Sequence, residues 1–368
     1  IEACHSGRDA EVGGSRPYGE TPSNRVRASL IRFLTLGGAD AVPVHETGVR
    51  LHGAWIDGVL DLDDVAVARP ISLIDCVVER IDARRARLRT LNLHGSRVLG
   101  GINADALRCE GPVNMRHGFE AGGPVRLIAA QLGVDLDCSS GRFEGAGGTA
   151  ILLDAAAVTG PFRLDEAHVE GEVSLTGAEI RGGLECHGSR LDNPRGDALV
   201  CNRAKLASVC LRDGFHATGA VRIDNAQVLG SVNCSGGSFD AGAEERRPDG
   251  EGDAGEGAGV ALSFNGSRVD GSLTLKGVTR IDGVLSLADL KAGRLSDDED
   301  AWQASRGELI LDGFVYGRFA NAPADAASRV EWLDGQLPAH LGPAFRPQPW
   351  EQLIGVLRSL GHPEEARL

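Results

Sequence analysis

Three consecutive segments decide the fold: FRLDEAHVEG (162–171), VSLTGAEIRG (173–182) and LECHGSRLDN (184–193). Each follows one template of apolar, any, apolar, any, any, small, any and apolar residue, and the copies begin at an even spacing, at Phe162, Val173 and Leu184. The first two apolar positions are separated by one residue, which is the period of a β-strand with one buried face. We therefore interpret these segments as a repeat of short strands.

The same template recurs along most of the chain at a nearly regular spacing. Further copies begin at Leu60, Ile71, Ile81, Leu91, Ile102, Val113, Val125, Leu136, Ile151, Val221, Val232, Leu262, Leu273 and Leu285, and weaker ones at Leu199, Val209 and Leu309. Strands this short cannot bury their apolar side alone, so successive coils must stack and pair their backbones. Because two units make one coil, we predict an all-β solenoid, a right-handed parallel β-helix with about 22 residues per coil.

Two family resemblances accompany the repeat. Ala167-His168-Val169 and Ala178-Glu179-Ile180 resemble the central residues of pentapeptide-repeat proteins, whose units form right-handed four-sided β-helices, although the step here alternates between five and six residues. The stretch PQPWEQLIGVLRSLGHPEEARL (347–368) is similar to the helical segment of actinobacterial solenoid proteins often labelled "membrane-associated oxidoreductase", and this resemblance covers residues 25–368. It implies a basic and membrane-spanning tail beyond this chain, and it assigns no chemistry to any residue.

Helical patterns flank the repeat. The segment SNRVRASLIRFLTLGG (23–38) predicts a helix with Ser23 or Asn24 as its cap, one face of Val26, Leu30, Phe33 and Leu34, and Gly37 at its end. A second helix should begin at Pro349 and end at Gly361, with another starting at His362 to form an αα-hairpin that either caps the last coil or binds a partner helix. We expect three parts: an N-terminal segment and capping helix (1–48), the β-solenoid (49–320) and a C-terminal helical cap (321–368).

Composition limits the class of protein. The chain is 42% hydrophobic but only 4% aromatic, which suits a narrow interior of small aliphatic side chains. No apolar run reaches the roughly 18 to 20 residues of a bilayer-spanning helix, and no secretory leader opens the chain. Two insertions, 240–259 and 296–305, carry a charge of −9 of the formal −14, and we expect both to be solvated acidic loops.

Most candidate chemical motifs are better explained by structure. Gly250-x-Gly252-x-x-Gly255 matches a dinucleotide fingerprint by chance, because it lies in an acidic loop with no helix pattern after it. The eight cysteines form no Cys-x-x-Cys pair and no zinc spacing, and Cys138, Cys186, Cys201 and Cys234 replace Leu in the template as buried, reduced thiols. His52, His94 and His187 share one outward position, without an acidic partner at a fixed spacing. We predict no catalytic residue, cofactor or metal ligand.

The sharpest surface feature is a run of arginines: Arg80, Arg84, Arg85, Arg87, Arg89 and Arg97, with only Asp82 to offset them. In ARRARLR (83–89), Ala86 and Leu88 take inward positions, so Arg85, Arg87 and Arg89 should project outward together. We name Arg84, Arg85, Arg87, Arg89 and Arg97 the arginine stripe, a candidate site for phosphate, anionic lipid or an acidic partner segment.

The favoured function is a non-enzymatic scaffold or protein-interaction module in the cytoplasm, membrane-proximal through a segment outside this chain. A protein is the expected partner, an anionic membrane surface the second choice, and nucleic acid is disfavoured. The alternatives are an enzyme or ligand-binding β-helix, an unassigned oxidoreductase included, and an acidic inhibitor that imitates DNA. A cleft lined by convergent Asp, His and Arg side chains would favour the ligand-binding alternative.

Overall fold

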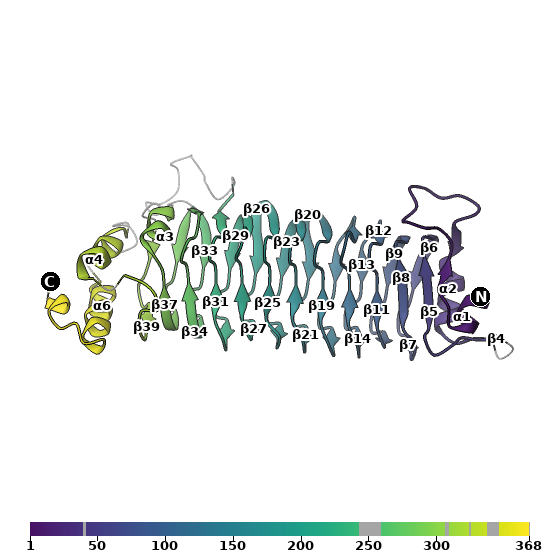
Figure 1. The fold of residues 1–368 in the computed structure, drawn as a ribbon, viewed down its shortest axis with the longest axis horizontal. Helices are drawn as coiled ribbons and strands as arrows, with labels where there is room; N and C mark the ends of the chain where they lie inside the picture. Colours follow the sequence, from purple (N-terminus) through teal and green to yellow (C-terminus); the bar gives the residue numbers. More distant parts are fainter. Residues whose placement is uncertain (40–41, 243–258, 306–308, 324, 337–345, 368) are drawn as a thin grey trace. The chain divides into compact units, whose positions relative to one another are not determined.

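The computed structural model describes residues 1–39, 42–242, 259–305, 309–323, 325–336 and 346–367. These residues form two compact units, Ile1–Glu185 (unit 1) and Cys186–Leu368 (unit 2). Each unit is a parallel β-solenoid whose short strands follow one another in sequence order (Figure 1). The predicted fold class, a parallel solenoid with short helices flanking it, is confirmed.

In unit 1 the strands belong to two parallel sheets, A and B. Sheet A contains β1 (Ala10–Glu11), β5 (Val49–His52), β7 (Ala66–Val67), β8 (Ile71–Ile74), β10 (Arg87–Leu88), β11 (Leu91–Asn92), β14 (Arg108–Cys109), β15 (Val113–Asn114), β18 (Gln131–Leu132), β19 (Leu136–Asp137), β21 (Ala157–Val158), β22 (Phe162–Arg163), β24 (Glu179–Ile180) and β25 (Leu184–Glu185). Sheet B contains β2 (Arg25–Arg27), β6 (Trp55–Asp61), β9 (Val77–Asp82), β12 (Arg97–Val98), β13 (Ile102–Asn103), β16 (Glu120–Ala121), β17 (Val125–Arg126), β20 (Arg142–Leu152) and β23 (His168–Ser174). A separate antiparallel pair joins β3 (Gly38–Ala39) to β4 (Val42–Pro43).

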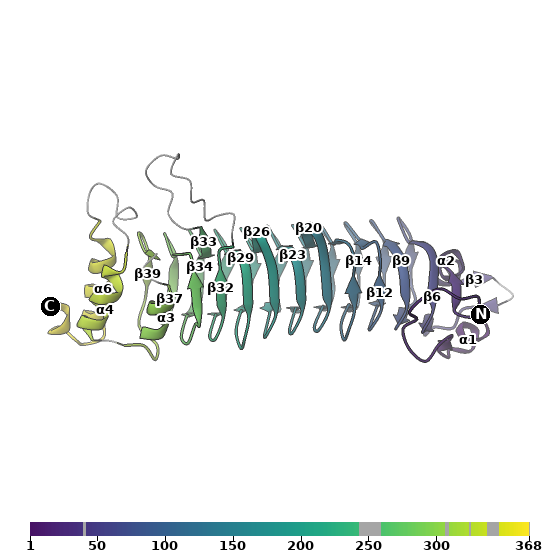
Figure 2. The same cartoon turned by 90° about the horizontal axis from the view of Figure 1, so that it is seen from above.

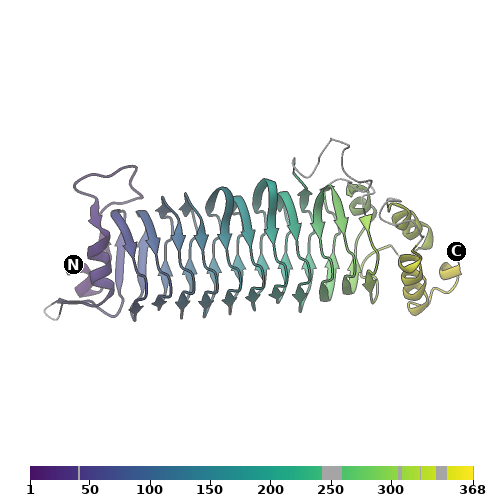
Figure 3. The same ribbon diagram turned by 180° about the vertical axis from the view of Figure 1, so that it is seen from behind.

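Unit 2 repeats this arrangement (Figure 3). Its sheet A strands are β27 (Lys205–Leu206), β28 (Val209–Cys210), β30 (Gln227–Val228), β31 (Val232–Asn233), β34 (Arg268–Thr274), β37 (Lys291–Ser296) and β39 (Val315–Tyr316). Its sheet B strands are β26 (Arg190–Val200), β29 (His216–Arg222), β32 (Ser238–Asp240), β33 (Val260–Ser263), β35 (Arg280–Asp282), β36 (Val284–Ser286) and β38 (Leu309–Ile310).

The register sets the length of one solenoid turn. Leu91 pairs with Val113, and Val113 pairs with Leu136, so one turn takes about 23 residues. Each such turn places one strand in each of four stacks, in which β10 pairs with β14, β11 with β15, β12 with β16 and β13 with β17. The predicted coil length, about 22 residues, is therefore close to the observed one.

The template positions line the interior as predicted. Leu91, Leu93, Ser96 and Val98 are buried, and the residue before the small position adopts a left-handed backbone at each corner. Gly95 has φ +64° there, but Ala106 (φ +55°) and Ala129 (φ +54°) hold the same conformation without glycine. Alanine disfavours a left-handed backbone, so the stacking of the turns must hold Ala106 and Ala129 in this conformation.

The N-terminal helix is shorter than expected. After α1 (Glu2–Ser6), helix α2 spans Ala28–Thr35 and packs against β2, β5 and β6 of unit 1 (Figure 2). A cap at Ser23 or Asn24 was the wrong prediction, because Arg25–Arg27 pair in register with Trp55–Asp57 and extend sheet B before the helix begins. The predicted face was also wrong in part, since Ile31 is buried whereas Phe33 is 47% exposed.

The helices of unit 2 depart further from the predictions. The segment 296–305, expected to be a solvated loop, contains helix α3 (Glu299–Ala304). The Asp298 carboxylate caps the start of this helix, and Ala301 is buried. Helix α4 (Ala326–Asp334) was not foreseen, whereas α6 (Gln348–Ser359) begins one residue before the predicted start. The expected helix at His362 is a single 3-10 turn, η1 (Glu365–Arg367). Among the described residues, no helix is both long enough and apolar enough to cross a bilayer.

Candidate arginine patch and neighbouring grooves

The arginine stripe is divided between two faces of unit 1. Arg85, Arg87 and Arg89 are exposed while Ala86 and Leu88 are buried, as the alternation predicted. Arg97, however, lies in β12 of sheet B, whereas Arg87 lies in β10 of sheet A. The five residues of the stripe therefore do not share one surface.

Several arginines of the run are neutralised by acids that the sequence analysis did not connect to them. Arg84 donates from Nε to Asp63 Oδ2 at 2.8 Å, and Arg85 donates to Asp64 at 2.7 and 2.6 Å. Hydrogen bonds from Arg84 hold the pKa of Asp63 below its usual value, and those from Arg85 do the same for Asp64. These acids lie 21 residues earlier, which is one turn away in space.

The remaining stripe residue on sheet B, Arg97, also has a partner. Its Nε lies 3.3 Å from Glu120, and Arg80, which belongs to the same run, pairs with Asp82 at 2.8 Å. The expectation that Asp82 alone offsets the run was wrong because the stacking of turns brings in acids from outside it.

Three arginines keep an uncompensated charge, and we call Arg87, Arg89 and Arg108 the arginine patch. Arg87 and Arg108 are direct neighbours in the register of β10 and β14, and all three side chains are exposed. Within the described residues, none of the three forms an ion pair with a carboxylate. Arg108 lies outside the arginine stripe predicted from the sequence, although it precedes Cys109 as Arg87 precedes Leu88 in the repeat.

A shallow groove of about 330 Å³ begins at the patch. Its lining runs over sheet A from Arg108 past Gln131 and Thr159 to Arg181. Arg181 is paired with Glu179 at 2.8 Å, whereas Arg108 has no such partner among the described residues, and the exposed carboxylate of Glu110 also lines the groove. The groove extends the patch across successive turns of unit 1.

The three histidines singled out from the sequence do not form one site. His52 does have an acidic partner, since its Nε2 lies 3.1 Å from Asp75 Oδ2 and its Nδ1 lies 2.8 Å from the carbonyl of Gly13. Asp75 lies one turn after His52, but the residue at the same spacing after His94 is His117, so this acidic partner is not repeated. His94 instead faces His117, with ring centroids 4.9 Å apart, and burial lowers the pKa of His94. His187 belongs to unit 2.

A second groove of unit 1, about 540 Å³ in volume, lies beside sheet B. The segment 15–18 forms one wall, where Arg16 donates to the carbonyls of Gly95 (3.1 Å) and Gly118 (2.8 Å) and pairs with Glu120. Trp55 and Val77, register neighbours on β6 and β9, contribute apolar surface. The full lining is Ser15, Arg16, Pro17, Tyr18, Trp55, Asp75, Val77, Gly95, Arg97, Leu99, His117, Gly118 and Glu120.

The cysteines are free thiols that are mostly buried. All eight thiols are free, and seven are buried while Cys210 is half-buried. Burial raises the pKa of Cys76 and of Cys109 to about 11 and that of Cys201 to about 12, which disfavours the reactive thiolate. The Gly250–Gly255 motif and most of the insertion 240–259 lie outside the described residues. Within the described ranges, no group of His, Cys, Asp and Glu has the arrangement of a metal site.

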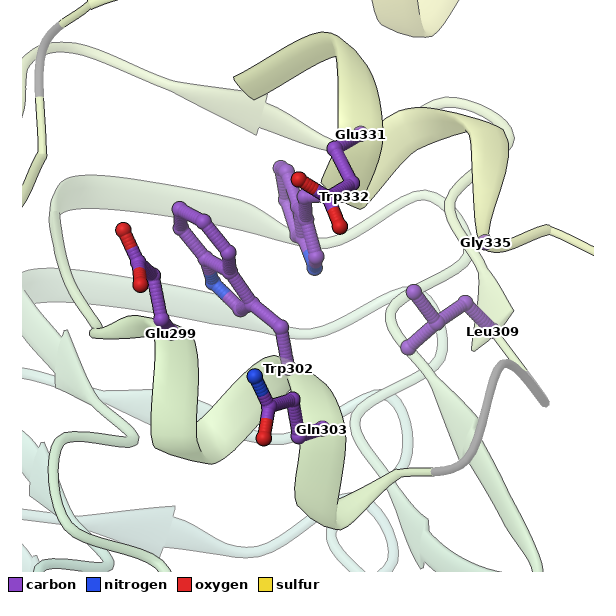
Figure 4. Close-up of a pocket in the computed structure, with 7 residues that line it drawn as sticks. All are labelled: Glu299, Trp302, Gln303, Leu309, Glu331, Trp332 and Gly335. Carbon is purple, nitrogen blue, oxygen red and sulfur yellow. The ribbon is translucent and has the colours of Figure 1, made fainter. Parts of the chain in front are cut away.

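In unit 2 a buried ion pair adjoins a small pocket. Arg329, fully buried, donates from Nη1 and Nη2 to the two oxygens of Asp297 at 2.7 and 2.8 Å and from Nε to the carbonyl of Pro323. Its guanidinium carbon lies 4.0 Å from the centroid of the Phe319 ring. A pocket of about 160 Å³ next to this pair is lined by Glu299, Trp302, Gln303, Leu309, Glu331, Trp332 and Gly335 (Figure 4).

These features define a parallel β-solenoid protein with an uncompensated arginine patch on one sheet of its first unit. No family model, curated protein or solved structure matches this chain.

Proposed function

We propose that this chain is a non-enzymatic interaction scaffold whose arginine patch binds an acidic segment of a partner protein. The observation that carries the proposal is the contrast between the patch and its surroundings. Arg84, Arg85 and Arg97 are each paired with a carboxylate, whereas Arg87, Arg89 and Arg108 have no such partner among the described residues. A partner carboxylate would supply the missing counter-charge.

The spacing of the patch favours an extended segment. Arg87 and Arg89 are two residues apart in extended chain, which separates them by roughly 6.6 Å. Arg108 lies on the neighbouring strand β14, roughly 4.8 Å from β10. Acidic side chains at alternate positions of an extended peptide have the same pitch as Arg87 and Arg89. The groove that leaves Arg108 over Gln131 offers a polar surface for the rest of such a segment.

Charge favours a protein segment over a bilayer as the partner. The chain carries a formal charge of −14, and Asp63 and Asp64 are already neutralised by Arg84 and Arg85. The net negative charge of the chain disfavours a broad anionic surface, whereas a narrow acidic peptide can contact the patch alone. We retain a membrane-proximal location as part of the proposal, on the resemblance of residues 347–368 to the solenoid proteins with a membrane-spanning tail.

The test compares two variants with the same change in net charge. Arg87→Glu/Arg89→Glu/Arg108→Glu reverses the patch, and Arg203→Glu/Lys205→Glu/Lys276→Glu reverses three exposed cations of unit 2 that form no ion pair within the described residues. The probe is a fluorescent peptide with alternating Asp and Gly, followed by anisotropy at two salt concentrations. We expect the patch variant alone to lose at least about tenfold in affinity.

Two outcomes would contradict the proposal. Equal affinities of both variants would show that net charge alone drives binding, and binding of all proteins to vesicles of phosphatidylserine but not to the peptide would favour a membrane surface instead. Circular dichroism of each variant must match the parent chain, since the reversed side chains are all exposed.

A ligand-binding function is the second candidate, favoured by the groove of about 540 Å³ in unit 1. Its volume is within the range of small-molecule sites, and its lining brings together Asp75, His117, Arg97 and Glu120 with the half-buried Trp55. Polar groups that converge beside an aromatic ring are what a saccharide or another polar ligand requires.

Intrinsic fluorescence tests this candidate, with mono- and disaccharides as probes. We expect a saturable change in emission that disappears in Trp55→Phe and persists in Trp350→Phe, which replaces a tryptophan of α6 in unit 2. The same response in both variants, or none in the parent chain, would remove this function from consideration.

A further inference from the structure

The small pocket of unit 2 combines aromatic walls with carboxylates. Trp302 of α3 and Trp332 of α4 lie side by side, with ring centroids 6.1 Å apart and an interplanar angle of 28° (Figure 4). Glu299 is one helical turn before Trp302 on α3, and Glu331 directly precedes Trp332 on α4. Both carboxylates line the same pocket as the two indoles.

Among the described residues, the surface formed by α3 and α4 carries more acidic than basic side chains. Helices α3 and α4 expose Glu299, Asp300, Glu331 and Asp334, and Arg329 is the one basic residue in either helix. Because Arg329 is buried and neutralised by Asp297, it offers no counter-charge to the pocket. Neither Glu299 nor Glu331 forms an ion pair with any described residue.

The indoles already stabilise one cation. The guanidinium carbon of Arg329 lies 5.0 Å from the ring centroid of Trp302 and 5.6 Å from that of Trp332, within the range of cation–π attraction. The ring quadrupole that attracts Arg329 also attracts a positive group over an accessible ring face, and Trp302 is the more accessible of the two indoles, since Trp332 is only 5% exposed. Carboxylates at the mouth add a long-range attraction for the same charge.

The size of the pocket limits the ligand. About 160 Å³ is well below the roughly 300 to 1,000 Å³ of sites for drug-sized molecules and nucleotides. A single ammonium head group with its first methylenes or methyl groups suits this volume. Gln303 and the buried Leu309 complete a lining that accepts both the charge and its alkyl substituents.

We propose that this pocket binds an alkylammonium group, supplied either by a lysine side chain of a partner protein or by a small quaternary amine. Both sources share a compact cation with apolar substituents, which aromatic and carboxylate groups recognise together. The site is separate from the arginine patch and has the opposite charge preference.

The test titrates the whole chain with tetramethylammonium chloride at constant ionic strength and follows the indole N–H signals of Trp302 and Trp332 by NMR. We expect saturable shifts of these two signals, and no such shifts with neutral tert-butanol. In Glu299→Gln/Glu331→Gln the affinity should fall about tenfold, because two attractive charges at the pocket are lost. Both side chains are exposed, so the fold should be retained.

Asp300→Asn/Asp334→Asn is the matched control, since it removes the same two charges from exposed acids of α3 and α4 that do not line the pocket. It should leave the affinity within about twofold of the parent value. An equal loss in the control and in Glu299→Gln/Glu331→Gln, or the absence of saturable shifts in the parent chain, would overturn the proposal.

A second arm identifies the source of the cation. The probes are a blocked Gly-Lys-Gly peptide and the same peptide with trimethyllysine. Tighter binding of either peptide than of tetramethylammonium supports a protein partner, and tighter binding of the free cation supports a small amine. Failure of all three probes would overturn the proposal without affecting the arginine patch, which lies in unit 1.

Discussion

The regular turns of unit 1 and the helical region of unit 2 bury their side chains by different chemistry. Inside the turns, stacked aliphatic positions such as Leu91, Leu93 and Val98 exclude charge, and arginines such as Arg84 and Arg85 form their ion pairs on the outside. Around α3 and α4, Arg329 and Asp297 are paired in the interior, at 0% and 1% side-chain exposure. In the described part of unit 1, Asp137 is a buried carboxylate but its partner Arg116 is 41% exposed, whereas the helical region of unit 2 buries both members of its ion pair.

Removing one partner of the buried pair should have the largest effect. Arg329→Met leaves the Asp297 carboxylate buried without its cation, and we expect a loss of about 3–5 kcal/mol in unfolding free energy. The double variant Asp297→Leu/Arg329→Met should recover much of this loss. Urea unfolding followed by circular dichroism measures both.

The exposed pair is the control for this comparison. Arg85→Ala removes an ion pair whose side chains are 60% and 61% exposed, and it should leave the urea midpoint almost unchanged because solvent screens the pair. Similar losses in Arg329→Met and Arg85→Ala would show that burial does not separate the two regions.

A polar side chain inside the regular turns should have the next effect. Ser96, fully buried, donates from Oγ to the carbonyl of Leu73 at 2.8 Å and accepts from the backbone N–H of Cys76 at 2.9 Å. Ser96→Ala leaves that N–H without its partner and should cost about 1–3 kcal/mol. An unchanged urea midpoint would mean that the corner tolerates an unpaired backbone group.

Alkaline pH should lower the unfolding free energy, because the unfolded chain can ionise thiols that are buried and protonated in the folded chain. Burial raises the pKa of Cys201 to about 12, above its ordinary value of 9.0. The folded state therefore keeps a proton that the unfolded state releases, so this stability is complete below pH 9 and is lost as pH rises from 9 toward 12.

The loss of unfolding free energy from this thiol should steepen above pH 9 as the unfolded thiol ionises, to on the order of 1 kcal/mol per pH unit. Cys201→Ala should lose less stability than the parent chain between pH 9 and 10, whatever its stability at neutral pH. Parallel curves for the two proteins would show that the thiol does not contribute. Urea unfolding at both pH values provides the measurement.

Substitution at a left-handed corner should have the smallest effect on stability, and it should stabilise the protein instead of destabilising it. Ala129 is exposed at φ +54°, so Ala129→Gly relieves strain of about 1–2 kcal/mol but adds chain entropy, for a net gain of about 0.5–1 kcal/mol. Ala157→Gly, in the strand β21, should destabilise instead. Thermal unfolding distinguishes the two directions.

The repeat could be predicted because each of its features is local in sequence. The two-residue alternation of Leu91 and Leu93 and the small residue at Ser96 follow from one template, and they specify the stacking without any knowledge of distant contacts. Helix α2 shows the limit, because pairing of Arg25–Arg27 with Trp55–Asp57 displaced its start from the predicted cap.

The candidate sites were only partly predictable for the same reason. Exposure of Arg87 and Arg89 follows from alternation, but neutralisation of Arg84 by Asp63 depends on which residues meet one turn away. The pocket of Trp302 and Trp332 joins segments that no repeat relates, so neither composition nor spacing indicates it. Arg108 can be recognised as the third member of the patch only from the strand register, which pairs it with Arg87.

The pairing of Leu91 with Val113 and of Val113 with Leu136 also constrains how such a chain can change in length. Removing one complete turn in unit 1 would bring equivalent strands into contact and keep every aliphatic side chain inside. Removing half a turn would place strands of sheet A against those of sheet B and break the alignment of corners. Length variation among natural versions of this protein should therefore occur in steps of whole turns, with smaller changes confined to the corners.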